Sequence, residues 1–385
     1  MTLTTNAPAA TYRPVHSDDS PPPRPRTAIG RVPDEERFVR ISSWVGGYAL
    51  AWLVCQHVLP LPGLAWFVVV GFVLGLALTV VSTAMTGSRT EVLDRVVASL
   101  VTAGAATVGL ALISVLVFVF HRGWRPLVHP NFFFHDMAAV GPRDAFSKGG
   151  IAHAIIGSAI ELGIAVVVTV PLGIGTAVFM TEVGGRLARV VRTIVEAMTA
   201  LPSIVAGLFI YTTLIIALGF PRSGFCAAMA ISVMILPIIA RASDVVLRVV
   251  PGGLREASLA LGASRWKTVW HVVLPTARPG LATALILGVA RGIGETSPVL
   301  ITSGVASFMV TDPRSGVMNS LPLYIFSTVR SGEPIAIERA FGAASVLLVL
   351  VLVLFVTARL LARPRGSRPP LVRRLVAARR LSKES

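Results

Sequence analysis

Long apolar runs dominate this sequence, and each has a length that suits a crossing of the lipid bilayer. A helix of about 20 apolar residues spans a hydrocarbon layer roughly 30 Å thick. Within that layer the backbone polar groups need partners in their own segment, so we expect these runs to be helices. The sequence therefore predicts an all-α, polytopic membrane protein with eight spans, at residues 43–60, 64–85, 94–120, 153–181, 198–219, 223–247, 279–302 and 341–362.

Charged residues are few and lie between these runs. They make up 14% of the chain, against 54% hydrophobic residues, whereas soluble domains carry about 25% charged residues. The net charge of +16 arises mainly outside the apolar runs, which indicates membrane topology and not a nucleic-acid groove. We expect membrane lipid, and no nucleic acid, among the partners. Cys55 and Cys226 lie in apolar stretches without metal-ligand spacing, so no metal site is predicted.

The distribution of Lys and Arg predicts the orientation of the chain. If the N-terminus is cytoplasmic, 25 of the 35 basic residues fall in cytoplasmic segments and 8 in outer segments. The other two lie within spans. This ratio predicts a multi-pass protein of the plasma (inner) membrane with both termini in the cytoplasm.

Composition divides the chain into four parts. Residues 1–42 are polar and rich in proline, and we expect a disordered cytoplasmic arm. Residues 43–85 predict a transmembrane hairpin with a tight turn at 59–63. Residues 94–362 hold the remaining six spans. Residues 363–385 form a basic cytoplasmic tail that we expect to contact anionic lipid headgroups.

The chain lacks the glycine-rich phosphate-binding loop of common ATPases, whose pattern is G-x-x-x-x-G-K-[ST]. It is therefore not expected to be an enzyme that hydrolyses ATP by that route. Any ATP-driven role requires a separate partner chain to hold ATP and Mg, and no cofactor is expected on this chain.

The cytoplasmic segment between the sixth and seventh spans predicts two short helices. Pro251 suits the first turn of one helix, and Gly262 suits its left-handed C-terminal cap. We expect Pro275 to end the second helix before the next span. The first helix is followed and flanked by small residues that allow another protein to approach closely, namely Ala257, Ser258, Ala260 and Ala263. The second has apolar residues at helical spacing, namely Trp266, Val269, Trp270 and Val273.

This segment resembles the EAA loop of bacterial ABC importer permeases. The matching pattern is Glu256-Ala257-Ser258, three residues, Gly262, nine residues, and a terminal Val272-Val273-Leu274-Pro275. The family pattern has alanine in place of Ser258 and isoleucine in place of Val272. The resemblance implies that residues 250–278, hereafter the coupling loop, dock on a cytoplasmic ATPase. The residues that carry this role would be Glu256, Ala257, Ser258, Gly262, Leu274 and Pro275.

Three further segments resemble phosphate ABC importer permeases of the PstA type. These are residues 149–158, residues 201–207 with Pro202-Ser203-Ile204-Val205, and residues 292–298 with Gly294-Glu295-Thr296-Ser297-Pro298. The resemblance covers about residues 94–362 and implies a six-helix permease core, to which 43–85 adds two helices. It also implies a homologous PstC-type permease partner, two cytoplasmic ATPase subunits and an extracytoplasmic phosphate-binding protein.

Ionisable residues inside predicted spans are candidates for an anion pathway. Arg291 and Glu295 are four residues apart, which places them on one helix face, and such residues at depth usually face a water-filled path or a partner. The planar donors of arginine match two phosphate oxygens. Thr296 follows in the family segment, and Glu161 lies in the fourth predicted span. A purely structural ion pair of Arg291 with Glu295 or Glu161 is the alternative.

The expected function is an ATP-driven import of inorganic phosphate across the plasma membrane. One alternative keeps the class and changes the solute to sulfate, molybdate or phosphonate. A less favoured alternative is an ion-coupled secondary transporter, which is expected to show inverted repeats with interrupted helices.

Overall fold

The computed structural model describes residues 34–58 and 63–362, and every regular element in those ranges is helical. The all-α prediction is confirmed. The chain divides into two compact units, residues 1–111 and 112–385. The helices are α1 Asp34–Leu53, α2 Leu64–Thr86, α3 Arg89–Leu127, α4 Asn131–Phe134, α5 Ala152–Val178, α6 Gly185–Thr199, α7 Ser203–Ile210, α8 Gly224–Val249, α9 Gly252–Ala260, α10 Arg265–Thr268, α11 Leu274–Gly292, α12 Ser297–Thr302, α13 Leu321–Val329 and α14 Pro334–Ala362. Short π-helical segments extend four regions, at Val54–Val58, Phe179–Val183, Tyr211–Ala217 and Val269–Val273.

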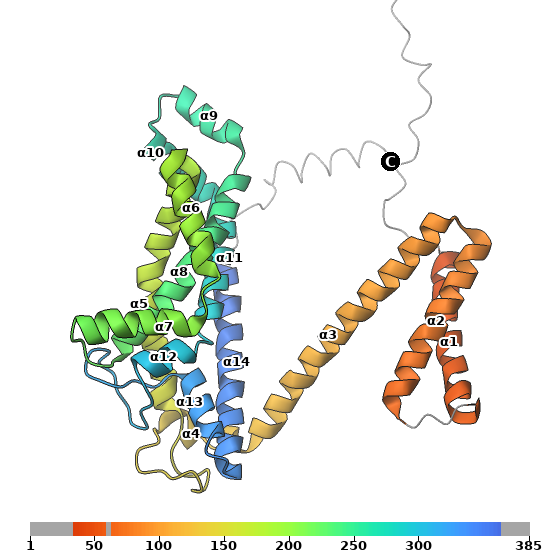
Figure 1. Cartoon of the computed structure of the whole chain (residues 1–385), viewed down its shortest axis with the longest axis horizontal. Coiled ribbons are helices and arrows are strands. Elements are labelled where there is room, and N and C mark those ends of the chain that lie inside the picture. The colour runs from red at the N-terminus through yellow and green to blue at the C-terminus, as the bar shows by residue number, and fades with distance from the viewer. Residues whose placement is uncertain (1–33, 59–62, 363–385) are drawn as a thin grey trace, which may run out of the picture. The chain divides into compact units, whose positions relative to one another are not determined.

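In the first unit, α1 and α2 pack side by side as the predicted hairpin (Figure 1). Gly47 faces Gly75 so closely that a Cβ on Gly47 would overlap the backbone of α2. Aromatic rings flank this crossing, with Trp44 against Phe72 at 5.5 Å between centroids. Small residues at a crossing are the usual means by which membrane helices approach closely.

In the second unit, α8 is the most buried of the candidate spans. Glycines of α5 and α11 lie directly against isoleucine side chains of α8. A Cβ on Gly173 of α5 would lie 2.8 Å from Ile239, and a Cβ on Gly288 of α11 would lie 2.6 Å from the same side chain. The core is therefore built around α8, with α5 and α11 drawn tightly against it.

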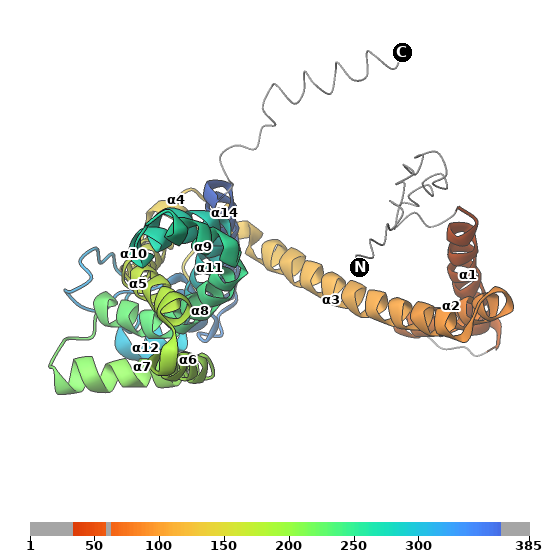
Figure 2. The same cartoon turned by 90° about the horizontal axis from the view of Figure 1, so that it is seen from above.

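The second unit has two different ends (Figure 1). At one end, α9 and α10 form an arc over the helices, as the view from above shows (Figure 2). At the opposite end lie α4, α13 and the irregular segments 135–151 and 303–320. An apolar cluster that includes Phe132, Ile151, Leu321 and Tyr324 holds these elements together.

Six helices in the described part of the chain are long and apolar enough to cross a membrane, and seven if one bent pair counts as a single span. The prediction of eight spans was therefore too high. The six are Leu64–Met85, Arg89–Leu127, Ala152–Val183, Gly224–Val249, Arg265–Gly292 and Pro334–Leu360, and the bent pair is Gly185–Thr199 with Ser203–Ala217.

Two predicted spans fail for identifiable reasons. The first, 43–60, belongs to a helix that begins at Asp34 within the sequence Asp-Glu-Glu-Arg, so its apolar length is short. Residues 34–42 are accordingly helical where a disordered arm was expected. The fifth, 198–219, contains Pro202, whose extended backbone separates α6 from α7 at an angle of 107°.

The seventh predicted span, 279–302, is also broken. Its helix ends at Gly292, and α12 begins five residues later at Ser297. Gly292 and Gly294 favour helix less than other residues, and Pro298 occupies the first turn of α12. The expected arm at 1–33, the turn at 59–62 and the tail at 363–385 lie outside the described residues.

The glycine crossing of the hairpin can be tested by oxidative crosslinking. Ser43 and Ser82 have hydroxyl oxygens 3.5 Å apart, so Ser43→Cys with Ser82→Cys is expected to form a disulfide in a Cys55→Ser, Cys226→Ala background. Gly47→Ala should lower the crosslinked fraction severalfold, because its methyl group overlaps the backbone of α2. The fraction is measured by mobility shift after cleavage at a protease site inserted at 59–62.

Gly46→Ala is the matched control, because its Cβ would meet only the Leu78 Cδ1 at 3.5 Å, an ordinary contact. Equal crosslinking in the two glycine variants would show that the helices do not cross at Gly47.

Candidate functional site

The coupling loop has the two-helix form that the sequence predicts. Pro251 precedes α9 with an extended backbone, and Gly262 follows it with a φ of +82°. A left-handed φ of this kind strains any residue with a Cβ, which explains glycine at this position. Glu256 and Ala257 lie exposed on α9, where no residue is buried.

Ser258 has a contact that explains its departure from the alanine of the family pattern. Its hydroxyl lies 2.9 Å from the hydroxyl of Thr268 on α10. Thr268 is buried. The two helices of the coupling loop are therefore joined by a hydrogen bond that an alanine could not make.

Arg255 fastens the coupling loop to the helices beneath it. Its guanidinium donates to the Val250 carbonyl at 2.7 Å and to the Leu247 carbonyl at 2.9 Å, both at the end of α8. It also forms an ion pair with Glu182 at 2.9 Å, at the end of the helix that α5 begins. This charge-assisted set joins α5, α8 and α9. Sequence reasoning missed it, because the partners are 73 residues apart.

Leu274 and Pro275 lie inside a helix whose length the sequence analysis predicted wrongly. Pro275 was expected to end the second helix, but α10, the π-helical turn Val269–Val273 and α11 form one continuous helix, Arg265–Gly292. The Leu274 amide donates to the Val269 carbonyl, which is the wider π spacing. Pro275 directly follows this π turn, whose wider spacing relieves the steric clash that a proline otherwise causes inside a helix.

The exposed surface of the coupling loop carries large apolar side chains. Leu261 is 89% exposed and Trp266 is 65% exposed. Trp266 packs edge-on against Trp270, with 5.9 Å between ring centroids. Large exposed aromatic and aliphatic side chains of this kind are typical of a surface that a partner protein covers.

Arg291 and Glu295 form an ion pair, but across a helix end and not along one helix face. Arg291 lies in the last turn of α11, and Glu295 lies in the break before α12. The Arg291 side chain is 51% exposed, whereas that of Glu295 is 4% exposed. The carboxylate is thus fixed in the protein, and the guanidinium is left accessible on its other side.

The two family-like segments at 201–207 and 292–298 meet at this break. A Cβ on Gly207 of α7 would lie 2.6 Å from the Pro298 Cα of α12. Ser203, at the start of α7, lies within hydrogen-bonding reach of the Glu295 carboxylate. Thr296 precedes α12 and is half-buried. Segments nearly 90 residues apart therefore surround the same ion pair.

Glu161 is buried in α5, with 1% of its surface exposed. Neither carboxylate oxygen has a hydrogen-bond partner in the described part of the chain, and Arg291 forms its ion pair with Glu295, not with Glu161. Its neighbour Leu162 comes within 3.5 Å of a Cβ position on Gly292. Glu161 thus lies on the stretch of α5 that passes the end of α11, and its place in a pathway stays a prediction.

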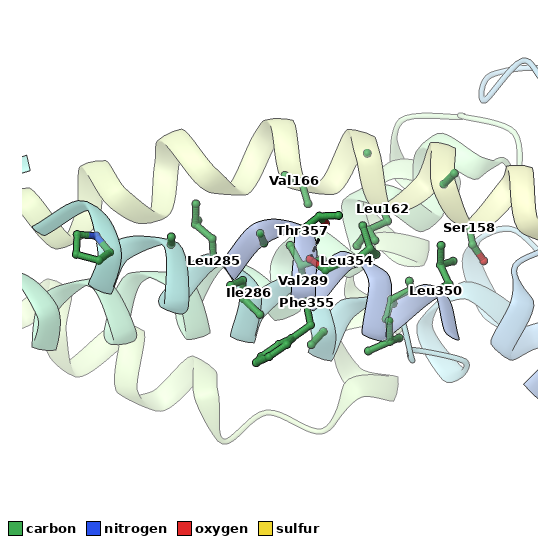
Figure 3. A pocket seen from close by; sticks show the side chains of 18 of the residues that line it. Ser158, Leu162, Val166, Leu285, Ile286, Val289, Leu350, Leu354, Phe355 and Thr357 are labelled. Atoms are coloured by element: carbon green, nitrogen blue, oxygen red, sulfur yellow. Dashed lines mark hydrogen bonds between the residues drawn. The ribbon is translucent and has the colours of Figure 1, made fainter. Parts of the chain in front are cut away.

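A groove of about 1010 Å³ runs between α5, α11 and α14 (Figure 3). Leu162, Ile286 and Leu354 point into it from the three helices, and Ser158 and Thr357 are among its few polar side chains. None of the four candidate pathway residues lines it. An apolar groove of this kind suits a lipid chain or a neighbouring helix better than an anion.

A second charged cluster lies near the coupling loop and was also missed. The Asp244 carboxylate on α8 accepts from Thr181 at 3.0 Å and pairs with Arg192 of α6 at 3.3 Å and with Arg248 at 3.1 Å. It fastens the amphipathic helix α6 to the end of α5 and α8. Arg248 is four residues from Asp244, but Thr181 and Arg192 are 63 and 52 residues away, and no local pattern predicts those two contacts.

Comparison with known proteins gives a consistent result. A family model described as "Binding-protein-dependent transport system inner membrane component" matches residues 169–364. A Mycobacterium tuberculosis protein named phosphate transport system permease protein PstA 1 is 39% identical over 243 residues, which are 63% of this chain and 79% of that protein. The Haemophilus influenzae protein named phosphate transport system permease protein PstA is 30% identical over 263 residues, 66% of this chain and 91% of that protein.

Among solved structures, one chain of the inward-facing MetNI methionine ABC transporter is 20% identical, with a TM-score of 0.45, over 56% of this chain and 93% of that one. The family model alone spans 196 of the 385 residues. With relatives of 30–39% identity that it covers over more than three quarters of their length, this chain belongs to the family of binding-protein-dependent transport system inner membrane components.

Proposed function

We propose that this chain is the permease subunit that carries inorganic phosphate through an ATP-driven importer. The observation that supports this most is the Arg291–Glu295 pair at the break between α11 and α12, where the two segments that resemble phosphate permeases meet. The relatives from M. tuberculosis and H. influenzae that carry a phosphate-transport name support the choice of solute.

The chemistry of the pair suits a transient anion site. The half-exposed guanidinium of Arg291 offers planar donors that match two phosphate oxygens. The negative charge of Glu295 offsets the positive charge of Arg291. An anion can therefore bind to the arginine donors without being held too tightly to leave. Thr296 adds a hydroxyl beside the pair. The proposed role of Glu161 is to line the same path from α5.

The proposed energy source is a pair of ATPase subunits that bind ATP and Mg and dock on the coupling loop. The apolar surface of Leu261, Trp266 and Trp270 is the contact, and Glu256 and Ala257 lie beside it on α9.

A homologous PstC-type permease completes the pathway, and an extracytoplasmic phosphate-binding protein docks at the end that carries α4 and α13. Both termini are then cytoplasmic, and the hairpin of α1 and α2 is an addition to the core.

The anion role of Arg291 is tested by uptake of radiolabelled phosphate in cells that lack other phosphate importers. Arg291→Ala should lower uptake at least tenfold, because the site loses a charge-assisted donor pair and leaves Glu295 as a buried, unpaired carboxylate. Arg291→Lys should retain an intermediate rate, since lysine keeps the charge and loses the planar donors.

Arg241→Ala is the matched control, because Arg241 is an exposed arginine on the neighbouring α8, and it should transport at the wild-type rate. Uptake that survives Arg291→Ala would contradict the role of this arginine. Deletion of the chain that spares phosphate uptake but abolishes sulfate, molybdate or phosphonate uptake would show another oxyanion as the solute.

The docking surface and the orientation are tested together by single cysteines at the two ends of the second unit, in the cysteine-free background. Leu261→Cys on the coupling loop should crosslink to a nucleotide-binding subunit and stay unlabelled by a membrane-impermeant thiol reagent in intact cells. Phe134→Cys, which is 80% exposed on α4, should react with the reagent and give no such crosslink. The opposite labelling pattern would reverse the proposed orientation.

The attachment of the coupling loop through Arg255 predicts a change in amide hydrogen exchange. Arg255→Ala removes three charge-assisted bonds, so exchange across residues 252–262 should accelerate about tenfold or more. Ser258→Ala removes one neutral hydrogen bond and should have a smaller effect. Equal exchange in Arg255→Ala and wild type would show that Glu182 and the α8 carbonyls do not hold the loop.

A further inference from the structure

A small cavity with both polar and apolar walls lies at the end of the second unit opposite α9 and α10. Its volume is about 180 Å³, and its walls come from α5, α13, α14 and the segments 137–142 and 305–319. Liquid water takes about 30 Å³ per molecule, so the space holds roughly six waters or one small tetrahedral ion. The four residues Arg291, Glu295, Thr296 and Glu161 do not line it.

The walls carry buried polar atoms without partners in the described part of the chain. They are both ring nitrogens of His153 and the Asn319 Oδ1, together with the Tyr324 hydroxyl, which has only the Thr328 side chain beside it. All three side chains are at least 96% buried. The His153 and Tyr324 rings meet edge-on, with 5.5 Å between centroids. A buried polar atom left unpaired costs about 1–3 kcal/mol, so several at one cavity indicate an occupant that pairs with them.

Asn319 has a defined orientation in this wall. Its Nδ2 donates to the Ala306 carbonyl at 2.8 Å, which leaves Oδ1 as the free atom. An amide oxygen only accepts hydrogen bonds. The wall therefore combines donors, from Tyr324 and one nitrogen of His153, with one obligate acceptor.

The charge at the cavity is positive. Arg339 lines it, is 2% exposed, and forms no ion pair in the part of the chain that the structure describes. One nitrogen of its guanidinium donates to the carbonyls of Asp144, Ala145 and Lys148 at 2.8–3.1 Å. Carbonyl dipoles orient the guanidinium, and the Asp144 carboxylate acts on it without forming an ion pair, so no carboxylate of the described residues lining the cavity contacts this buried cation.

The nearest carboxylates already have partners of their own. Asp136 accepts from the amides of Ala138 and Met309. A hydrogen bond from the Gly141 amide, together with the charge of Lys148 and to a smaller extent that of Arg339, holds the pKa of the Asp144 carboxyl below its usual value. Neither residue lines the cavity. They do not supply the missing negative charge inside it.

We propose that this cavity is a binding site for one protonated tetrahedral oxyanion, with inorganic phosphate as the ligand. His153, Tyr324 and Arg339 donate to its oxygens, and its P–OH group donates to Asn319 Oδ1. Sulfate has no proton for that acceptor at neutral pH and would leave it unpaired, which lowers affinity. The inference rests on the proposed function, because it makes the cavity the first site that the solute occupies on this chain at the end where the binding protein docks.

The test is equilibrium binding of radiolabelled inorganic phosphate to the complete permease complex in lipid nanodiscs, without ATP and without the binding protein. The measurements are made in an Arg291→Ala background, so that anion held at that arginine is not counted. We expect saturable binding, a dissociation constant raised about tenfold by Tyr324→Phe, and a further rise when His153→Leu is added. Sulfate should compete at least tenfold less well than phosphate.

Tyr211→Phe is the matched control, because Tyr211 lies outside the cavity, and it should bind phosphate as the background does. Gel filtration shows that each complex remains assembled. An intact complex without saturable phosphate binding would show a cavity that holds water only and would overturn the inference. Binding unaffected by both cavity substitutions, or equal competition by sulfate, would overturn it as well.

Failure here is separable from failure of the proposed function. Phosphate uptake that depends on the chain and on Arg291, together with a cavity that binds no phosphate, rejects only the cavity site. Uptake that is independent of the chain rejects the function, whatever the cavity binds.

Discussion

The constraint on which this structure depends is that lipid offers no hydrogen bonds to a peptide backbone. Long helices meet this constraint because they pair their backbone groups within one segment, and α5, α8 and α14 are the clearest examples. The interruptions are more informative, because a break is tolerated only where protein or an aqueous path surrounds it. The chain breaks between α6 and α7 and again between α11 and α12, and the two breaks lie together, with Gly207 against Pro298. The region that departs from regular helix is also the one that holds Arg291 and Glu295.

Local patterns in the sequence predicted the features that local chemistry decides. The all-α class, the hairpin at 43–85, the start of α9 after Pro251 and the left-handed Gly262 all follow from apolar length or from backbone geometry at one residue. The pairing of Arg291 with Glu295 was predicted from their spacing, but its position across the end of α11, and not along one helix face, was not predicted. The same spacing occurs at a helix end because the turn through residues 293 and 294 still brings position 295 back toward position 291.

Features that depend on distant residues could not be predicted from one sequence. Nothing local distinguishes Arg255 from any other arginine of a cytoplasmic loop, yet it joins two helix ends through Glu182 and two carbonyls. Arg339 lies two residues before the last predicted span, 341–362, and proves to be almost fully buried. The prediction that a helix ends at Pro275 was wrong, because the sequence does not reveal the π turn before it. The wider π turn removes the steric penalty that normally ends a helix at proline.

The continuity of Arg265–Gly292 has a mechanical consequence. Twenty-eight residues at 1.5 Å each make a helix of roughly 42 Å, with the tryptophan surface at one tip and Arg291 at the other. Glu295 is not part of this helix, because it lies beyond the break and is held by its own neighbours. A tilt of about 5° about the tryptophan tip displaces Arg291 by roughly 3–4 Å, and a displacement of that size away from Glu295 separates the two groups beyond the N···O limit of about 4 Å for an ion pair. Contact between Arg291 and Glu295 therefore depends on the angle of the helix Arg265–Gly292.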